Sequence, residues 1–158
     1  MTDPGKPDQE VIEWRPGVHT RLHACRRLGS ETLAVIEQWC AINSGAPLHT
    51  HFDVEEVIYI SRGEAEFSID TIVRHVGSGE TILLPPQSWH SFRNVGTGTL
   101  QAISVFASPE PLVCYADEPN TVLAVGGSGE MLDRHRAKIS NEPPTFLLSS
   151  RDPASLLS

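Results

Sequence analysis

Apolar and polar residues alternate over short stretches along much of this chain. In a strand, successive side chains point to opposite faces, so a period of two indicates a β-strand. No segment keeps the longer period of an amphipathic helix over many turns, and many short strands with glycine turns favour a sandwich or a barrel. The alternation predicts strands at about 17–27, 33–42, 56–61, 64–69, 71–76, 81–84 and 100–107, with shorter ones at 112–115 and 121–125.

The stretch 33–42 differs from the other predicted strands because both of its faces are largely apolar. One face carries Gln38 as its polar residue, and the other carries Glu37 beside Trp39. A strand of this kind needs cover on both sides. We expect a second copy of the chain, or the chain's own tail, to supply the outer cover, and we therefore predict a homodimer with overlapping termini.

The ends of the chain lack this pattern, so the sequence predicts one domain with two extensions. Residues 1–14 are polar and rich in proline and glycine, and we expect a disordered tail there. A barrel domain is predicted over 15–125. Residues 126–158 form a C-terminal arm or tail in this prediction, with room for two turns of helix at 130–138.

Composition and charge narrow the class of protein. The chain has 158 residues, 39% hydrophobic and 20% charged, which suits one globular domain. Its formal charge of −8 argues against nucleic acid and anionic membranes as partners. No apolar run approaches the length of a membrane span, and the first residues do not resemble a signal peptide. The three cysteines lack metal-type spacing, so we expect buried thiols and a cytoplasmic location.

Candidate chemistry gathers between Gly45 and Gly63. His49 and His51 share one face of an extended strand, and Glu56 follows five residues after His51. Two imidazoles and a carboxylate on one surface are suitable ligands for a divalent transition metal. The stretch therefore predicts most of a metal site.

Other histidines suit a metal less well. His19 and His23 could be ligands because they share one face of the predicted strand 17–27. Nothing acidic lies at ligand spacing, however, and arginines share the segment. His75 lies next to an arginine and is interpreted as an exposed strand residue.

The central stretch, written Gly45-x3-His49-x-His51-x4-Glu56-x6-Gly63, resembles the first motif of the cupin superfamily. The family's second motif has its counterpart further on, in Gly79-x5-Pro85-x4-His90-x3-Asn94. Gln87 stands where the family usually has glycine, so the turn there is either strained or built differently. Two motifs in the family's order, at 45–63 and 79–94, make the resemblance specific.

The resemblance implies an all-β fold, the double-stranded β-helix or jelly-roll barrel of cupins, here with extended N- and C-terminal arms, and it also points to a homodimer. It assigns four metal ligands, which are His49, His51, Glu56 and His90. Glu55 is the rival to Glu56, because only one of two successive residues in a strand can face the histidines. The six-residue gap to Gly63 selects Glu56.

Three imidazoles and a carboxylate leave about two positions open on a six-coordinate metal. We expect one divalent transition metal, with Fe, Mn or Ni suited to this arrangement and Zn also able to bind. Alternation from the ligands along their strands, and the polar position within 33–42, indicate the substrate-pocket residues Gln38, Ile58, Ile60 and Phe92. Gln38 could equally be a hydrogen-bonded strand residue. The pocket is expected to be small and apolar, with no arginine, lysine or further titratable group near the metal.

The hypothesis favoured by these residues is a small metal-dependent cupin enzyme of the dioxygenase type. It would act on a small organic substrate that chelates the metal, such as a diol, diketone or enol. One alternative is a metal-dependent isomerase or lyase that needs no further cofactor. Another is a non-catalytic small-molecule-binding cupin, and the fold itself does not choose among the three.

Overall fold

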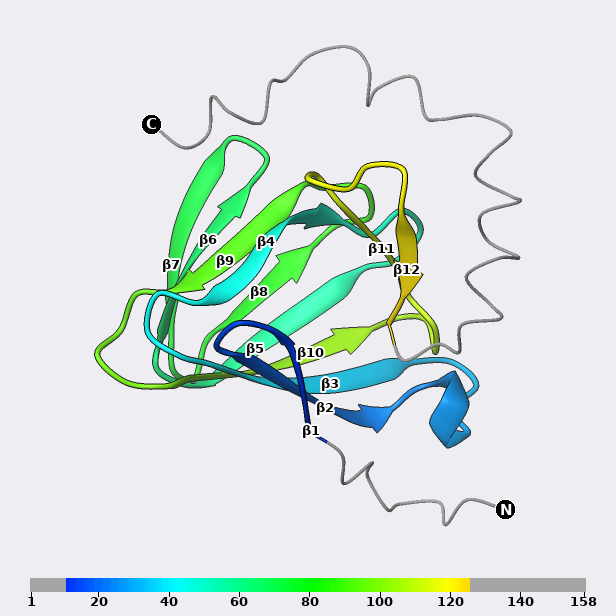
Figure 1. The fold of residues 1–158 in the computed structure, drawn as a ribbon, viewed down its shortest axis with the longest axis horizontal. Helices are drawn as coiled ribbons and strands as arrows, with labels where there is room; N and C mark the ends of the chain where they lie inside the picture. Colours follow the sequence, from blue (N-terminus) through cyan, green and yellow to red (C-terminus); the bar gives the residue numbers. More distant parts are fainter. Residues whose placement is uncertain (1–10, 126–158) are drawn as a thin grey trace.

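A computed structural model describes residues 11–125, which form two antiparallel sheets of six strands each (Figure 1). The first sheet contains, in spatial order, β1 (Val11–Arg15), β2 (Val18–Ala24), β3 (Ala34–Cys40), β10 (Leu100–Phe106), β5 (Glu56–Arg62) and β8 (Thr81–Leu84). The second sheet contains β12 (Val122–Ala124), β11 (Leu112–Tyr115), β4 (Gly45–Thr50), β9 (His90–Asn94), β6 (Glu64–Ile69) and β7 (Ile72–Gly77). One short 3-10 helix, η1 (Arg26–Leu28), links β2 to β3. The prediction of an all-β sandwich or barrel is confirmed.

The N-terminal boundary differs from the sequence prediction. Residues 11–14, expected in a disordered tail, belong to β1, which pairs antiparallel with β2. The apolar side chain of Trp14 explains the difference, because it packs against the core between the sheets. The expectations for residues 1–10, for the arm at 126–158 and for a helix at 130–138 lie outside the described residues. No helix in the described part of the chain is long and apolar enough to cross a membrane.

The core lies between the two sheets and follows the alternation of the strands. In β3, buried and half-buried residues alternate strictly, with Ile36 and Gln38 pointing inward. The other face of β3 is partly covered by side chains of neighbouring strands. There Glu37 accepts a hydrogen bond from Gln101 at 2.6 Å and lies 2.7 Å from the ring of His23.

Close approach of two backbones explains the glycine that begins the first motif. A Cβ atom at Gly45 would lie 2.0 Å from the carbonyl oxygen of Phe92 on the paired strand β9. At the other end of β9, the buried amide of Asn94 donates to the carbonyls of Cys40 and Gly98 at 2.9 and 2.8 Å. These motif residues fix the position of β9, which carries His90.

Gln87 occupies a turn that connects the two motifs. Its φ angle is 68°, in the left-handed region that glycine adopts at little cost. Its backbone N–H donates to the carbonyl of His51 at 2.7 Å. The turn therefore holds the segment before His90 against the end of β4 with its backbone in the left-handed region.

Replacing Gln87 with glycine should stabilise the fold by about 0.5–1 kcal/mol, because relief of left-handed strain exceeds the extra chain entropy of glycine. Urea unfolding followed by tryptophan fluorescence measures the change. Gln87→Ala is the matched control, since it removes the same side chain but keeps the strain. Equal stability of the two variants would contradict the explanation.

Candidate metal centre

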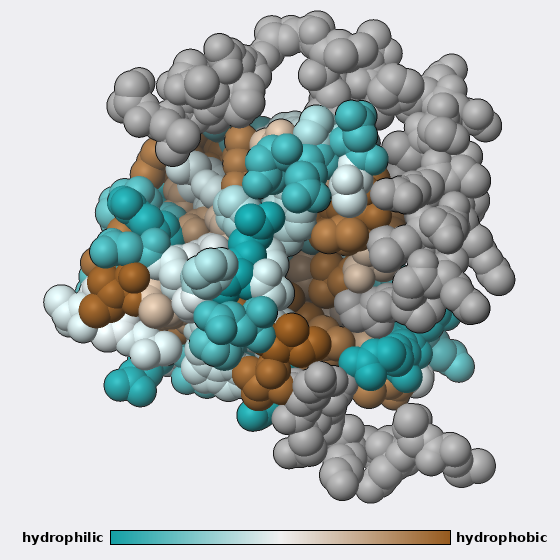
Figure 2. All heavy atoms as spheres, in the orientation of Figure 1, coloured by the Kyte–Doolittle hydropathy of each residue, from teal (hydrophilic) through white to brown (hydrophobic). Residues whose placement is uncertain are grey.

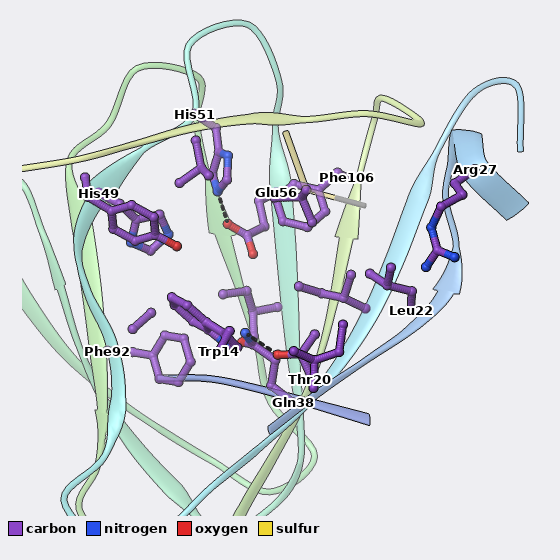
Figure 3. A pocket seen from close by; sticks show the side chains of 17 residues that line it. Trp14, Thr20, Leu22, Arg27, Gln38, His49, His51, Glu56, Phe92 and Phe106 are labelled. Carbon is purple, nitrogen blue, oxygen red and sulfur yellow. Dashed lines mark hydrogen bonds and ion pairs between the residues drawn. The ribbon is translucent and has the colours of Figure 1, made fainter. Parts of the chain in front are cut away.

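Four side chains from three strands meet at one end of the space between the sheets. His49 lies near the end of β4, His51 directly follows it, and His90 begins β9 beside His49. Glu56 begins β5 and approaches from the first sheet (Figure 3). One ligand atom from each residue lies within 4.8 Å of the others, and all four residues are buried. The structure thus brings together all four predicted ligands.

The backbone orients each imidazole. Nδ1 of His49 lies 2.6 Å from the carbonyl oxygen of Pro47, and Nδ1 of His51 lies 2.7 Å from that of Leu112. Nδ1 of His90 lies 3.1 Å from the carbonyl oxygen of Ser88. A carbonyl only accepts, so each Nδ1 carries the proton and donates it. The lone pair of each ring then belongs to Nε2, which is the arrangement that metal-binding histidines require.

Glu56 places a carboxylate among these rings. Its Oε2 lies 3.4 Å from Nε2 of His51 and 3.4 Å from Nε2 of His90. Neither contact has hydrogen-bond geometry, so Oε2 of Glu56 and Nε2 of His90 are buried polar atoms without a hydrogen-bond partner. Unpaired buried polar atoms are costly, and a cation between them would satisfy both.

The pKa values of these groups favour the forms that bind a metal. Burial lowers the pKa of His49 to about 3, and the neighbouring His90 and His51 act in the same direction. For Glu56, burial raises the pKa, but His51 and His90 outweigh this effect and hold it below its ordinary value. Neutral imidazole and an ionised carboxylate are the donors that a divalent transition metal takes. The cluster could therefore hold such a metal.

The two neighbouring glutamates are clearly separated by strand alternation. Glu56 is 4% exposed and faces the histidines, whereas Glu55 precedes β5 and is exposed. The structure places His23 against Glu37 at 2.7 Å and His75 against Glu66 at 3.3 Å, both outside the cluster.

A cavity of about 300 Å³ opens beside the cluster and includes His49, His51 and Glu56 in its wall. Figure 2 shows hydrophobic atoms lining a recess near the centre of the face it presents. Of the four residues that the sequence assigns to a substrate pocket, Gln38, Ile58 and Phe92 line this cavity and Ile60 does not. It lies two residues further along β5, where it is fully buried in the core between the sheets.

The floor of the cavity contains a polar pair. The amide of Gln38 on β3 donates to the hydroxyl of Thr20 on β2 at 3.3 Å (Figure 3). Thr20 therefore positions the amide of Gln38. Both residues line the cavity. Gln38 is thus both a hydrogen-bonded strand residue and part of the cavity wall, which joins the two interpretations that the sequence left open.

The sequence prediction missed Tyr115, a titratable group near the cluster. Tyr115 pairs with His49 across β11 and β4, and their ring centroids lie 5.5 Å apart. Burial raises the pKa of Tyr115 to about 12 despite the opposing charge of Arg15, so its hydroxyl stays protonated at neutral pH. The guanidinium carbon of Arg15 lies 4.6 Å from the centre of the tyrosine ring, and Trp14 packs nearby.

Arg27 in η1 also lines the cavity, which corrects the expectation that no arginine does so. Neither Tyr115 nor Arg27 belongs to a recognisable motif, and both come from segments outside 45–94. The only sequence signal was the aromatic residue in the apolar run Leu112–Tyr115. A pattern within one strand cannot show that Tyr115 pairs with His49, because that pairing depends on the sheet order.

Comparison with known proteins gives matches over the same region. Residues 41–106 match the family model of the cupin domain. An uncharacterized protein of Methanocaldococcus jannaschii is 29% identical over 82 residues, which cover 52% of this chain and 62% of that protein. The match therefore spans less than two thirds of this curated relative.

Solved structures share the fold at low sequence identity. KdgF from Halomonas sp. has a TM-score of 0.56 and 18% identity, with 64% of this chain and 88% of that chain covered. A recombinant oxalate oxidase in complex with glycolate has a TM-score of 0.61 and 16% identity, over 82% and 75%. A mutant of Bacillus subtilis oxalate decarboxylase has a TM-score of 0.65 and 17% identity, over 92% and 38%.

Both sequence motifs lie within the described sandwich. The segment that matches the cupin-domain model carries all four residues of the cluster. The solved structures share the arrangement of strands around it. Residues 41–106 of the chain are therefore similar to a cupin domain, and the described fold is that of the solved cupin structures.

Proposed function

We propose that this protein is a metal-dependent cupin enzyme of the dioxygenase type, acting on a small organic substrate that chelates the metal. The observation that carries the proposal is the set of three Nε2 lone pairs facing a buried carboxylate at the wall of an apolar cavity. His49, His51, Glu56 and His90 would hold one divalent ion, for which Fe, Mn and Ni are the best candidates and Zn a further one.

Bound there, such an ion would supply Lewis acidity and a place where a chelating substrate and dioxygen can meet. The chain's own residues would do the rest. Ile58, Phe92 and Phe106 give the cavity an apolar lining that would disfavour water beside the substrate. The Gln38–Thr20 pair offers polar atoms that can orient a substrate. Glu56 keeps its negative charge toward the three rings, and the backbone carbonyls keep the rings in place.

Tyr115 favours a second candidate, a metal-dependent isomerase or lyase. Its hydroxyl stays protonated near neutral pH beside the cluster, and it lines the cavity. A positioned proton donor of this kind suits enolisation and elimination, which need no dioxygen. The two candidates use the same metal ligands, and they differ in whether dioxygen is consumed.

Metal uptake tests the site directly. Wild-type protein reconstituted with Fe²⁺, Mn²⁺ or Ni²⁺ and desalted should keep about one equivalent of metal by elemental analysis. The His51→Ala, His90→Ala double variant should keep less than about one tenth of that, because two of four donors are lost. His75→Ala is the matched control, since His75 is exposed and lies outside the cluster. Equal metal contents in the wild type and the double variant would rule out the site.

The reaction class is tested with the loaded protein and a panel of small diols, diketones and enols. For at least one of them, oxygen-electrode traces should show dioxygen consumption that requires both metal and substrate and that falls at least tenfold in the double variant. Turnover under strict anaerobiosis would select the isomerase or lyase. Tight binding without any product, with several metals, would select a non-catalytic binding protein.

We also propose that a second copy of the chain covers the outer face of the first sheet. Apolar residues lie side by side there. Val57 on β5 pairs with Leu83 on β8 and with Val105 on β10. These three are 37%, 55% and 39% exposed, and Tyr59 beside them is 40% exposed. A contiguous apolar face of this kind is typical of an interface. The three buried cysteines are unpaired, which supports a reducing compartment, and we propose the cytoplasm.

Light scattering coupled to size-exclusion chromatography should give twice the chain mass for the wild type. Val105→Lys should shift the equilibrium toward the monomer by at least tenfold, because it places a charge in the centre of the apolar face. Val73→Lys is the control, since Val73 is 59% exposed on β7 of the other sheet. A wild type that is monomeric at micromolar concentration would disprove the homodimer.

A further inference from the structure

The polar pair of Gln38 and Thr20 lies away from the metal cluster, at the opposite end of the view in Figure 3. Gln38 is 7% exposed, and its neighbours on the inward face of β3 are the buried apolar residues Ile36 and Cys40. A buried amide loses water as a hydrogen-bond partner, and this loss is costly unless another partner replaces it. An amide at this position of an otherwise apolar strand face therefore needs hydrogen bonds inside the molecule or with a ligand.

The hydrogen bond within the pair uses only part of its capacity. Within residues 11–125, the side chain of Gln38 makes one hydrogen bond, the donation to Thr20 at 3.3 Å. A threonine hydroxyl that accepts such a bond can still donate its own proton, and a glutamine amide also has a carbonyl oxygen that accepts. Oε1 of Gln38 is not among the unpaired polar atoms that are sealed from solvent, and both residues line the cavity. An acceptor of Gln38 and a donor of Thr20 are thus available to a molecule in the cavity.

The register of the first sheet places this pair at a distance from the cluster. Gln38 pairs with Ala102, and Ala102 pairs with Ile60, four residues beyond Glu56 on β5. Because a strand rises about 3.3 Å per residue, the level of Gln38 lies roughly 13 Å along the sheet from that of Glu56. The apolar side chain of Ile58 lines the cavity between these two levels. A ligand that reaches both ends therefore has its second polar group several ångströms from the atoms that chelate the metal.

We propose that the ligand of this cavity carries a neutral hydroxyl group at the end opposite its metal-chelating atoms, and that Gln38 and Thr20 bind this hydroxyl. The inference rests on the proposed function and adds the substrate class to it. A hydroxyl both donates and accepts, so it can donate to Oε1 of Gln38 while it accepts the proton of Thr20. A carboxylate has no proton to give and would set two acceptors against each other. A methyl group would leave both polar side chains without a partner, which costs affinity.

The test uses full-length protein that is loaded with Co²⁺ and kept under argon, because the visible absorption of Co²⁺ reports ligands that reach the metal. Three probes share a catechol as the chelating group and differ at the far end. 4-(2-Hydroxyethyl)catechol ends in a hydroxyl, 4-propylcatechol in a methyl of similar size, and 3-(3,4-dihydroxyphenyl)propionate in a carboxylate. The wild type should bind the hydroxyl probe about tenfold more tightly than either of the others, a preference of about 1.4 kcal/mol. In Gln38→Leu the preference over the propyl probe should fall to about one, with binding of the propyl probe unchanged, and Thr20→Val should lower it as well.

Gln101→Leu is the matched control, because it removes the same amide from β10 of the first sheet, outside this cavity. It should keep the wild-type preference. The inference is overturned, with the metal site intact, if the loaded wild type binds none of the probes or prefers the propyl or carboxylate probe. It is also overturned if Gln38→Leu keeps the preference or if Gln101→Leu loses it equally. If Gln38→Leu takes up no Co²⁺, Thr20→Val decides, and an unchanged preference in that variant overturns the inference. Failure of the wild type to take up Co²⁺ has a different meaning, since it overturns the proposed function and the inference together.

Discussion

The burial of one carboxylate among three imidazoles is the constraint on which the rest of this site depends. An ionised group in the interior costs several kcal/mol unless it is paired, and Glu56 is 4% exposed. His49 cannot neutralise it as a cation, because burial holds the pKa of this imidazole far below neutral. The backbone carbonyls hold each Nδ1–H outward, so all three Nε2 atoms remain lone-pair donors. A cation between the carboxylate and the rings would satisfy both, and this requires the four side chains to be held in place.

This requirement explains several features of the fold that would otherwise seem unrelated. The backbone N–H of Gln87, in its left-handed turn, donates to the carbonyl of His51 and so holds the loop before β9 against the end of β4. Gly45 allows β4 and β9 to approach closely, which brings His49 beside His90. Asn94 holds the other end of β9 through two backbone carbonyls. The motif residues that are not ligands thus act on the positions of the ligands.

The sequence predicted the strands and the cluster because both depend on local spacing. Alternation within a strand decides that Glu56 rather than Glu55 faces inward, and the second motif supplies His90 in register. Tyr115, Trp14 and Arg27 could not be predicted in this way. They reach the cavity through the order of strands, since β11 lies beside β4, β1 lies at the edge of the first sheet, and η1 follows β2. Ile60 lies outside the cavity for a related reason, because alternation gives the face of a residue but not its position along the strand.

The division between these two groups of residues has a consequence for function. The motif-derived residues build a centre that suits oxygenation, isomerisation and elimination equally well, because all three need the same donors. Under the proposed function, groups in the cavity wall would distinguish these reactions, namely the protonated hydroxyl of Tyr115 and the polar pair of Gln38 and Thr20. These residues come from β2, β3 and β11, which lie outside the two motifs at 45–63 and 79–94. If the proposed function holds, selectivity for the ligand would reside in the strands that flank the motifs.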